Sequence, residues 1–489
     1  MNTKAAINRL ATGVPGLDAV LGGGLPEYSF NLIAGAPGCG KTTLAHQMMF
    51  ALATPERSAL YFTVMGEPPL KMLRYQQQFD FFDSAAVNTS IRFINLSAEM
   101  ETGDLEQVLA RIIGEVERWQ PALVFIDSFR AVVIAGEHGE NPFIHLQRFI
   151  QRLGTLMTSW QATTFLIGEY FSAVESGAIF TVADGLILLH QSVHRNSIVR
   201  KIEIAKMRGQ PSLAGLYSFR IGASGIHVFA PPRPAALAAP AAPAEAGEGR
   251  LGLGNPKLDA MMGGGLARGS SLLVAGPSGS GKTILANAFL EEGARCGETC
   301  VIAAFEQRAS RSRGPAIAEL IARGQIGVVN TWAVDLSVDE IAALIIAEIT
   351  RLQASRVVID SLSGFELSLA PTFREEFRES MARLVAAVVG TGATLLMTSE
   401  LEDRYDDLRF SPYGTAFLTD AIIVQRYIEV NSHLLRVMAV VKVRGSAHSD
   451  ALRLFHIDGA GIQIGDMLTG YEGLLGGRPT RSPVSRHES

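Results

Sequence analysis

Short runs of apolar and β-branched residues recur along this chain, and in most of them successive positions rather than alternate positions are apolar. In the first half we predict strands at residues 30–34, 59–64, 123–126 and 163–167. Unbroken apolar runs of this length are typical of parallel strands that are buried on both faces. A helix is predicted at residues 44–53, as the next element after the first strand and a glycine-rich segment. The pattern therefore indicates an α/β domain.

A different pattern closes this half of the chain. Residues 185–190 and 200–205 are two strand-like segments separated by a short polar turn, which is typical of an antiparallel hairpin. Residues 421–424 and 436–441 repeat this arrangement later in the chain. We therefore expect a mostly parallel sheet, flanked by helices, with an antiparallel hairpin at its end.

The pattern occurs twice because the chain itself is duplicated. Four landmarks of the first half recur in the same order in the second half, and the offsets are all close to half the chain length. The pairs are Leu17-Asp18-Ala19 with Leu258-Asp259-Ala260, Lys41 with Lys282, Ile126-Asp127-Ser128 with Ile359-Asp360-Ser361, and Lys206-Met207-Arg208-Gly209 with Lys442-Val443-Arg444-Gly445. Each half is thus predicted to be one copy of the same α/β domain.

The composition marks the boundary between the two copies. Residues 231–250 are rich in Ala and Pro and have no hydrophobic period, which predicts a semi-rigid or disordered linker. We place the first domain at residues 1–230 and the second at residues 251–465. The tail, residues 466–489, is predicted to be partly disordered.

The bulk composition restricts the class of protein. The 489 residues are 47% hydrophobic and 19% charged, as in an ordinary globular protein. A net charge of -5 argues against a generally basic surface that coats nucleic acid, although it leaves room for a local basic channel. The three cysteines cannot close a disulfide set, and no apolar run is long enough to form a signal core or a membrane span. We expect a cytoplasmic protein without a membrane partner.

Two segments carry the pattern Gly-x-x-x-x-Gly-Lys-Thr, at Gly35–Thr42 and Gly276–Thr283. Glycines allow the backbone N–H groups to surround phosphates, and the following helix presents its positive end to the same anion. The lysine reaches the β- and γ-phosphates, and the threonine hydroxyl holds Mg²⁺. The alternative is a glycine-rich turn before a helix, but two matches at equivalent positions favour ATP binding. The predicted nucleotide-binding residues are Gly35, Pro37, Gly38, Gly40, Lys41, Thr42 and Thr43 in the first loop, and Gly276, Ser278, Gly279, Ser280, Gly281, Lys282, Thr283 and Ile284 in the second.

Carboxylates at strand ends complete the predicted chemistry. Asp127 and Asp360 each end an apolar strand, where they could hold Mg²⁺ together with Thr42 and Thr283, although aspartate is also a common helix N-cap. Hydrolysis needs a carboxylate that orients or deprotonates water. Glu67 and Glu306 are the predicted catalytic residues, and the alternative is a solvated loop carboxylate for each. Glu169 and Glu400, after later strands, are weaker candidates that would face the γ-phosphate.

With these motifs the chain resembles the KaiC family of RecA-like ATPases over nearly all of both halves. The resemblance implies two tandem RecA-like P-loop NTPase domains and a ring, usually a hexamer, that forms two stacked rings with ATP and Mg²⁺ at the subunit interfaces. In that family the Lys-x-Arg-Gly turn reaches the nucleotide of the neighbouring subunit. The corresponding residues are Lys206, Arg208, Lys442 and Arg444, which could otherwise form a basic turn on the surface.

The chain departs from the family pattern in two places. KaiC-like domains usually have two adjacent glutamates after the second strand, whereas this chain has Gly66-Glu67 and Glu306-Gln307. The clock protein's phosphorylated Ser-Thr pair is replaced by Ala416 and Phe417, although Ser411, Thr415 and Thr419 lie nearby. Residues 470–473 resemble the family's C-terminal loop, which implies a regulatory protein partner at the tail.

Four functions follow from these observations. The first is an ATP-hydrolysing ring with a regulatory or signalling role, and the second is a serine/threonine autokinase that uses the second domain. The third is a DNA motor, for which Arg308, Arg311 and Arg313 are the notable basic run, although a solvated helix face explains the same run. The fourth is a scaffold in which ATP only holds subunits together.

Overall fold

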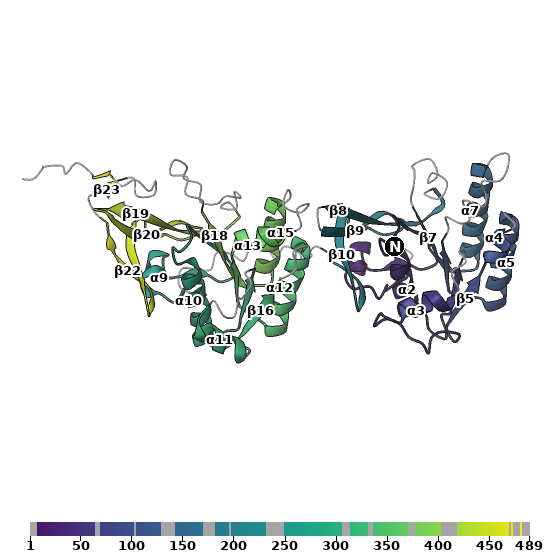
Figure 1. Ribbon diagram of the computed structural model, residues 1–489, viewed down its shortest axis with the longest axis horizontal. Helices are drawn as coiled ribbons and strands as arrows, with labels where there is room; N and C mark the ends of the chain where they lie inside the picture. Colours follow the sequence, from purple (N-terminus) through teal and green to yellow (C-terminus); the bar gives the residue numbers. More distant parts are fainter. Residues whose placement is uncertain are drawn as a thin grey trace, which may run out of the picture. The chain divides into compact units, whose positions relative to one another are not determined.

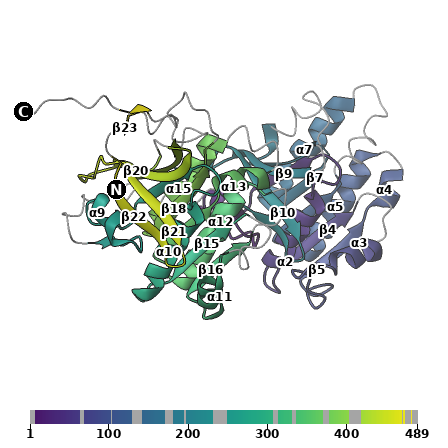
Figure 2. The same ribbon diagram turned by 60° about the vertical axis from the view of Figure 1, so that its left-hand side comes forward.

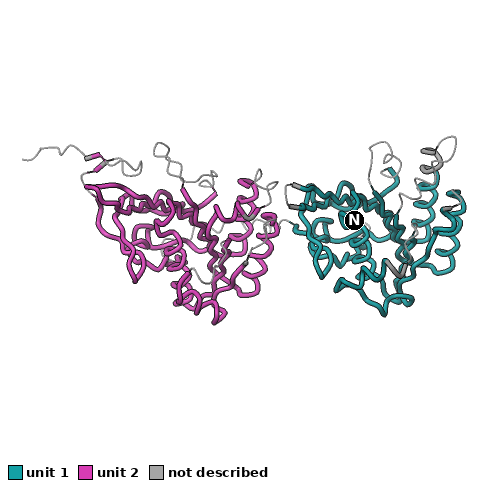
Figure 3. Tube along the Cα trace, viewed as in Figure 1, with its two compact units in different colours: residues 1–230 teal, residues 231–489 magenta. Residues whose placement is uncertain are grey.

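The computed structural model places two compact units along the chain, residues 1–230 and residues 231–489 (Figure 3). The described residues are 7–63, 69–101, 104–128, 142–169, 181–194, 197–230, 249–305, 313–330, 336–369, 377–401, 418–468, 471–472 and 480–481. Most of the predicted linker and most of the predicted tail therefore lie outside the described residues.

In the described part of the first unit, nine strands form one sheet in the order β11-β10-β9-β8-β3-β7-β6-β4-β5 (Figure 1). The strands from β5 to β8 in this order are parallel, and those from β8 to β11 are antiparallel. Their bounds are β3 Phe30–Gly35, β4 Ala59–Thr63, β5 Ile91–Asn95, β6 Leu123–Asp127, β7 Thr163–Gly168, β8 Gly185–His194, β9 Ser197–Met207, β10 Leu216–Gly222 and β11 Gly225–Val228.

Helices cover both faces of this sheet, because successive residues of its central strands point to opposite sides. Tyr61 and Phe125 join a core with α1 and α2, whereas Phe62 and Ile126 join a second core with α5 and α7. A short pair of strands, β1 Arg9–Leu10 and β2 Leu25–Pro26, lies outside the sheet. The helices are α1 Leu17–Leu21, α2 Lys41–Leu52, α3 Pro69–Gln76, α4 Ser97–Glu101, α5 Leu105–Trp119 and α7 Pro142–Ser159.

The second unit repeats this architecture (Figures 1 and 2). Its sheet has the order β16-β15-β17-β18-β14-β19-β20-β21-β22, with β14 Ser271–Gly276, β15 Cys300–Ala304, β16 Ile326–Asn330, β17 Arg356–Asp360, β18 Thr394–Glu400, β19 Ala421–Val430, β20 His433–Val443, β21 Arg453–Asp458 and β22 Gly461–Met467. Short pairs are β12 Arg250–Leu251 with β13 Leu266–Ala267 and β23 Tyr471–Glu472 with β24 Thr480–Arg481. The helices are α9 Pro256–Met261, α10 Lys282–Arg295, α11 Pro315–Ala322, α12 Val338–Leu352, α13 Leu362–Ser368 and α15 Phe377–Gly390.

The predicted fold class is confirmed: each unit is a mostly parallel sheet, flanked by helices, with an antiparallel hairpin. Several element bounds differ from the predicted ones, among them those of the helix after the first loop and of the hairpin strands. The first loop helix begins at Lys41 rather than Leu44, because Gly40 takes a φ of 107° and ends the loop there. The hairpin strands β8 and β9 continue into the polar residues that the sequence predicts to form the turn. Among the described helices, none is both long and apolar enough to cross a membrane.

Candidate functional site

Each phosphate-binding loop joins the end of a central strand to the start of a buried helix. In the first unit β3 ends at Gly35 and α2 begins at Lys41, and in the second β14 ends at Gly276 and α10 begins at Lys282. Gly38 and Gly40 have φ values of 74° and 107°, and the matched glycines of the second loop have values within a few degrees of these. A Cβ added at Gly38 would meet no atom within 4 Å, so the backbone conformation, not space, requires glycine there.

The loop lysines turn back onto their own loops. The Nζ of Lys41 donates to the carbonyl oxygens of Gly35 at 2.9 Å and Ala36 at 2.8 Å. Lys282 makes the matched bonds, at 2.8 and 2.7 Å. Burial lowers the pKa of Lys282, while the nearby charges of Glu400 and Asp360 oppose this shift. Both ammonium groups are thereby held at the mouth of a loop whose N–H groups suit a phosphate.

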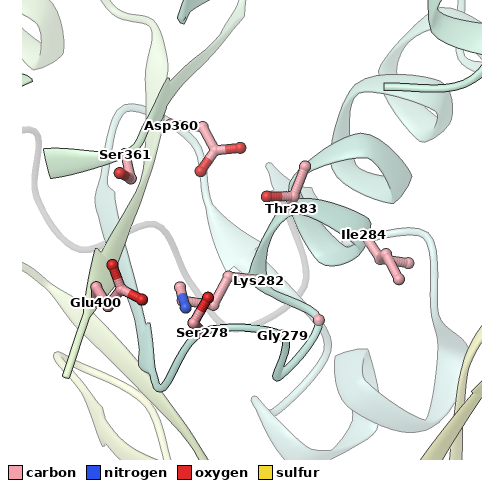
Figure 4. Close-up of a pocket in the computed structure, with 9 residues that line it drawn as sticks. Ser278, Gly279, Lys282, Thr283, Ile284, Asp360, Ser361 and Glu400 are labelled. Carbon is pink, nitrogen blue, oxygen red and sulfur yellow. The ribbon is translucent and has the colours of Figure 1, made fainter. Parts of the chain in front are cut away.

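The second loop borders a pocket of about 290 Å³. The side chains of Lys282, Thr283, Asp360 and Glu400 surround it (Figure 4). The full lining is Ser278, Gly279, Gly281, Lys282, Thr283, Ile284, Asp360, Ser361 and Glu400. Most of the predicted loop residues and the predicted metal ligands of the second unit thus meet around one cavity, together with the weaker candidate Glu400 and with Ser361, which was not predicted as a site residue.

In the first unit, Asp127 accepts hydrogen bonds from two hydroxyl groups. Thr42 Oγ1 donates to Asp127 Oδ2 at 2.8 Å, and Tyr61 Oη donates to the same oxygen at 2.7 Å. Burial, together with the charge of Asp127, raises the pKa of Tyr61 well above its usual value, so this phenol remains a donor. Tyr61 was missed by the sequence reasoning, because its place in an unbroken apolar strand indicated only a core residue.

In the second unit, Asp360 meets a cation instead. Arg313 Nη2 donates to Asp360 Oδ2 at 2.5 Å, and Thr398 Oγ1 donates to Asp360 Oδ1. The Arg313 side chain is only 5% exposed and the Asp360 side chain 8%. Arg313 also exchanges two hydrogen bonds with Asn287 of α10, one through its guanidinium and one through its carbonyl oxygen. The interpretation of Arg313 as part of a solvated helix face is therefore wrong.

The buried side chains beneath each phosphate-binding loop also differ between the units. Ser280 Oγ bonds to Gln425 Oε1 at 3.0 Å in the second unit, and both residues are buried. The matched positions of the first unit hold Cys39 and Leu189, which are buried as well. Burial raises the pKa of the Cys39 thiol, so this cysteine is not a thiolate nucleophile.

The two Lys-x-Arg turns lie at the edge of the sheet opposite the loops. Arg208 N donates to the Asp184 carbonyl oxygen, and Asp184 N donates to the carbonyl oxygen of Phe30, where β3 begins. The loop starts at the other end of β3, about 17 Å away for a strand of this length. A β-bulge precedes Lys206 in the first unit, and another precedes Lys442 in the second.

Both turns are held locally. Arg208 pairs with Asp184 at 3.3 Å, and Arg444 pairs with Asp420 at 3.2 Å; both arginine side chains are more than half exposed. Lys442 Nζ donates to the Thr419 carbonyl oxygen at 2.5 Å. Burial, then the nearby Arg208, lowers the pKa of Lys206. These cations are therefore placed away from the phosphate-binding loop of their own unit.

A second pair of arginines lies at the loop edge instead. Arg200 pairs across the hairpin with Gln191, two residues after Leu189, which faces Gly35. Burial raises the pKa of the loop residue Cys39, and the charge of Arg200 offsets a small part of that rise. Arg436 takes the matched position and its guanidinium lies over the ring of Tyr427, whose hydroxyl approaches Gly279. Sequence reasoning missed them, although each lies six residues before the lysine of a Lys-x-Arg turn.

Several predicted residues lie outside the described residues. These are the predicted catalytic residues Glu67 and Glu306, the arginines Arg308 and Arg311 of the basic run, the positions Ala416 and Phe417, and the possible acceptors Ser411 and Thr415. Thr419 is described, and it is fully buried. Glu169 follows β7 and Glu400 ends β18, at matched positions of the two sheets.

Comparisons with known proteins agree with the duplicated architecture. The family model described as "ATPase: KaiC" matches residues 10–233 and, again, residues 252–468. The chain is 28% identical to the circadian clock oscillator protein KaiC of Parathermosynechococcus lividus over 491 residues, which cover 98% of this chain and 89% of that protein. It is also 28% identical to the KaiC proteins of Picosynechococcus sp. and Rippkaea orientalis, with 98% and 99% of this chain and 93% and 94% of those proteins covered.

Proposed function

The chain belongs to the KaiC ATPase family, and from that premise we propose that it is an ATP-hydrolysing ring protein with a regulatory or signalling role. ATP is bound by the loop of each unit, and Glu67 and Glu306 activate water. The observation that carries the proposal is the repeated arrangement of a lysine-bearing loop beside a strand-end aspartate, in both units.

The position of the Lys-x-Arg turns supports assembly. Arg208 and Arg444 lie at the opposite end of the central strand from their own loop, about 17 Å away. An arginine side chain cannot span that distance. These exposed cations are therefore out of reach of the nucleotide in their own loop, and we propose that they act on the nucleotide of another subunit, where a cation supplied in trans stabilises the charge of the transition state. We propose a homo-oligomer, with a hexamer in two stacked rings as its form, and a regulatory protein as the partner of the tail.

The residues of the first unit fit a magnesium ion. Thr42 and Asp127 bring a hydroxyl oxygen and a carboxylate oxygen to within 2.8 Å of each other, and oxygen ligands of this kind suit Mg²⁺. When bound, the ion would neutralise charge on the phosphates. In the second unit Thr283 and Asp360 line the same pocket, but Asp360 is already engaged by Arg313. The fit is therefore unequal.

ATP turnover of the full-length chain tests the proposal. We expect Glu67→Gln and Glu306→Gln each to reduce the turnover of their own unit by about 100-fold, because general base catalysis has about that effect. Glu106→Gln is a matched control, since Glu106 is exposed and pairs only with Arg152 among the contacts described here. Turnover that stays at the level of the control in both variants would contradict the catalytic assignment.

Gel filtration with ATP tests the ring. We expect Arg208→Ala and Arg444→Ala to weaken the ATP-dependent oligomer, and Lys41→Ala to impair assembly more than Lys282→Ala. An oligomer of the same size in all four variants, with or without ATP, would contradict a nucleotide at the subunit interface.

The alternative functions have less support from the described residues. Autophosphorylation needs an accessible hydroxyl, and Thr419 is fully buried. A DNA motor needs a basic channel, and Arg313 is buried against Asp360 rather than exposed. A scaffold with negligible turnover predicts ATP-dependent assembly together with no hydrolysis, so the two experiments above separate it from the ATPase.

A further inference from the structure

We propose that Arg313 competes with the divalent cation for Asp360, so that the second site binds its cation weakly until the arginine is withdrawn. The inference rests on the proposed nucleotide binding at this site. It concerns a positioning residue that acts through Asp360 and assigns no catalytic step to Arg313.

The contacts of Asp360 support this competition. Both of its carboxylate oxygens are engaged, one by the Arg313 guanidinium and the other by the Thr398 hydroxyl. A cation that binds to Asp360 through either oxygen must displace one of these donors or share the oxygen with it. A guanidinium–carboxylate bond is a strong, charge-assisted one, and two cations at the same carboxylate repel each other.

Arg313 is also held in this position from a second side. Its Nη1 donates to Asn287 Oδ1 at 3.1 Å, and Asn287 Nδ2 donates to the Arg313 carbonyl oxygen at 3.0 Å. Asn287 lies four residues after Thr283, so both residues share one face of α10. The guanidinium is therefore fixed along the same helix face that presents the predicted metal-binding hydroxyl. Because its side chain is 5% exposed, it cannot leave without opening the packing around it.

The hydrogen bonds described for Asp127 in the first site come from two hydroxyl groups, those of Thr42 and Tyr61. Thr42 itself donates to Asp127, at 2.8 Å. A neutral hydroxyl becomes a ligand of an arriving cation when it rotates, and it adds no repulsion. The position of α2 that matches Asn287 is His46, whose ring packs against Tyr61 at a tilted angle, with the ring centroids 4.6 Å apart. The partners of the two aspartates thus differ at several positions together.

The test measures Mn²⁺ binding by electron paramagnetic resonance on the full-length chain with a saturating, non-hydrolysable ATP analogue. A Lys41→Ala background removes nucleotide from the first site. In this background we expect Arg313→Met to tighten Mn²⁺ binding by about tenfold, the usual scale for groups that act through a metal ligand. Arg323→Met is the matched control and leaves the affinity unchanged, because Arg323 is an exposed residue that pairs with Glu319. A change of less than threefold in Arg313→Met overturns the proposal.

A second comparison needs no substitution at Arg313, in case that variant does not fold. In the Lys41→Ala variant the measured Mn²⁺ affinity is that of the second site, and in the Lys282→Ala variant it is that of the first site. We expect weaker Mn²⁺ binding at the second site, and equal or tighter binding there overturns the competition. Binding of a fluorescent ATP analogue, measured in excess chelator and again with Mn²⁺, separates the proposed nucleotide binding from the proposed role of Arg313. If no analogue binds to the second site even when Mn²⁺ is added, the proposed function fails there, whereas binding without the expected Mn²⁺ difference defeats only the role of Arg313.

Discussion

Asp127 and Asp360 end matched strands of two matched sheets, yet they meet different partners. Asp127 accepts from Tyr61, which lies on the neighbouring strand β4. Asp360 accepts from Thr398, which lies on β18, on the other side of its strand. Only Asp360 has a buried arginine among the contacts described above. Duplication has therefore preserved the backbone position of the carboxylate while its electrostatic surroundings have changed.

The residues on the strands beside each aspartate differ between the units at two matched positions together. Tyr61 matches Ile302 in the sheet register, and Thr398 matches Ile167. Each unit thus brings one hydroxyl from a neighbouring strand to its aspartate and has isoleucine at the matched position of the strand on the other side. Two sites with the same sequence motif can therefore differ chemically, because the electrostatic properties of a carboxylate depend on neighbouring residues that the motif does not contain.

The largest effect on stability is expected where the buried ion pair is broken. Arg313→Met should lower the free energy of unfolding of the second unit by about 3–5 kcal/mol, because it leaves Asp360 buried without its cation. Urea denaturation followed by circular dichroism measures the change. Arg323→Met, at an exposed pair, should change it by less than about 0.5 kcal/mol. If the two variants were equally stable, Arg313 would not be the partner that compensates the charge of Asp360.

A smaller effect on the free energy of unfolding of the first unit is expected when the pH is lowered. Burial lowers the pKa of His46 from 6.5 to about 4, so the unfolded chain binds a proton between these values that the folded unit excludes. The free energy of unfolding should therefore fall as the pH is lowered from 6.5 to 4, by at most about 3 kcal/mol. Equilibrium unfolding across this range measures the change. His46→Leu should remove this part of the pH dependence, and an unchanged profile in that variant would refute the assignment to His46.

The smallest effects on stability are expected when one hydroxyl group that donates a hydrogen bond to each aspartate is removed. Tyr61→Phe should destabilise the first unit alone, and Thr398→Val the second unit alone, by about 2 kcal/mol each, as expected for a hydrogen bond to a charged group. Hydrogen exchange resolved by unit measures both changes. Destabilisation of the opposite unit, or of neither, would show that these hydroxyls are not the separate supports of the two aspartates.

Much of the site could be predicted from local patterns. A glycine-rich loop between a strand and a helix defines its own backbone conformation, and the structure shows positive φ values at Gly38 and Gly40. Asp127 and Asp360 were recognisable because an apolar run that ends in a carboxylate places it at the sheet edge. Arg313 was not recognisable, since arginines are mostly exposed and nothing near it in sequence indicates a buried anion.

The sequence by itself thus determined the duplication, the α/β fold, the two loops and the position of each strand-end aspartate, because periodicity and glycine content are local properties. Only the tertiary structure decided which groups those aspartates meet. Arg313 is 47 residues from Asp360 and Thr398 is 38 residues from it, so the order of the strands brings them together. The same holds for Arg208, which the reversal of β9 carries to the far end of the sheet. Sheet order and chain reversal are long-range properties, and no local pattern specifies them.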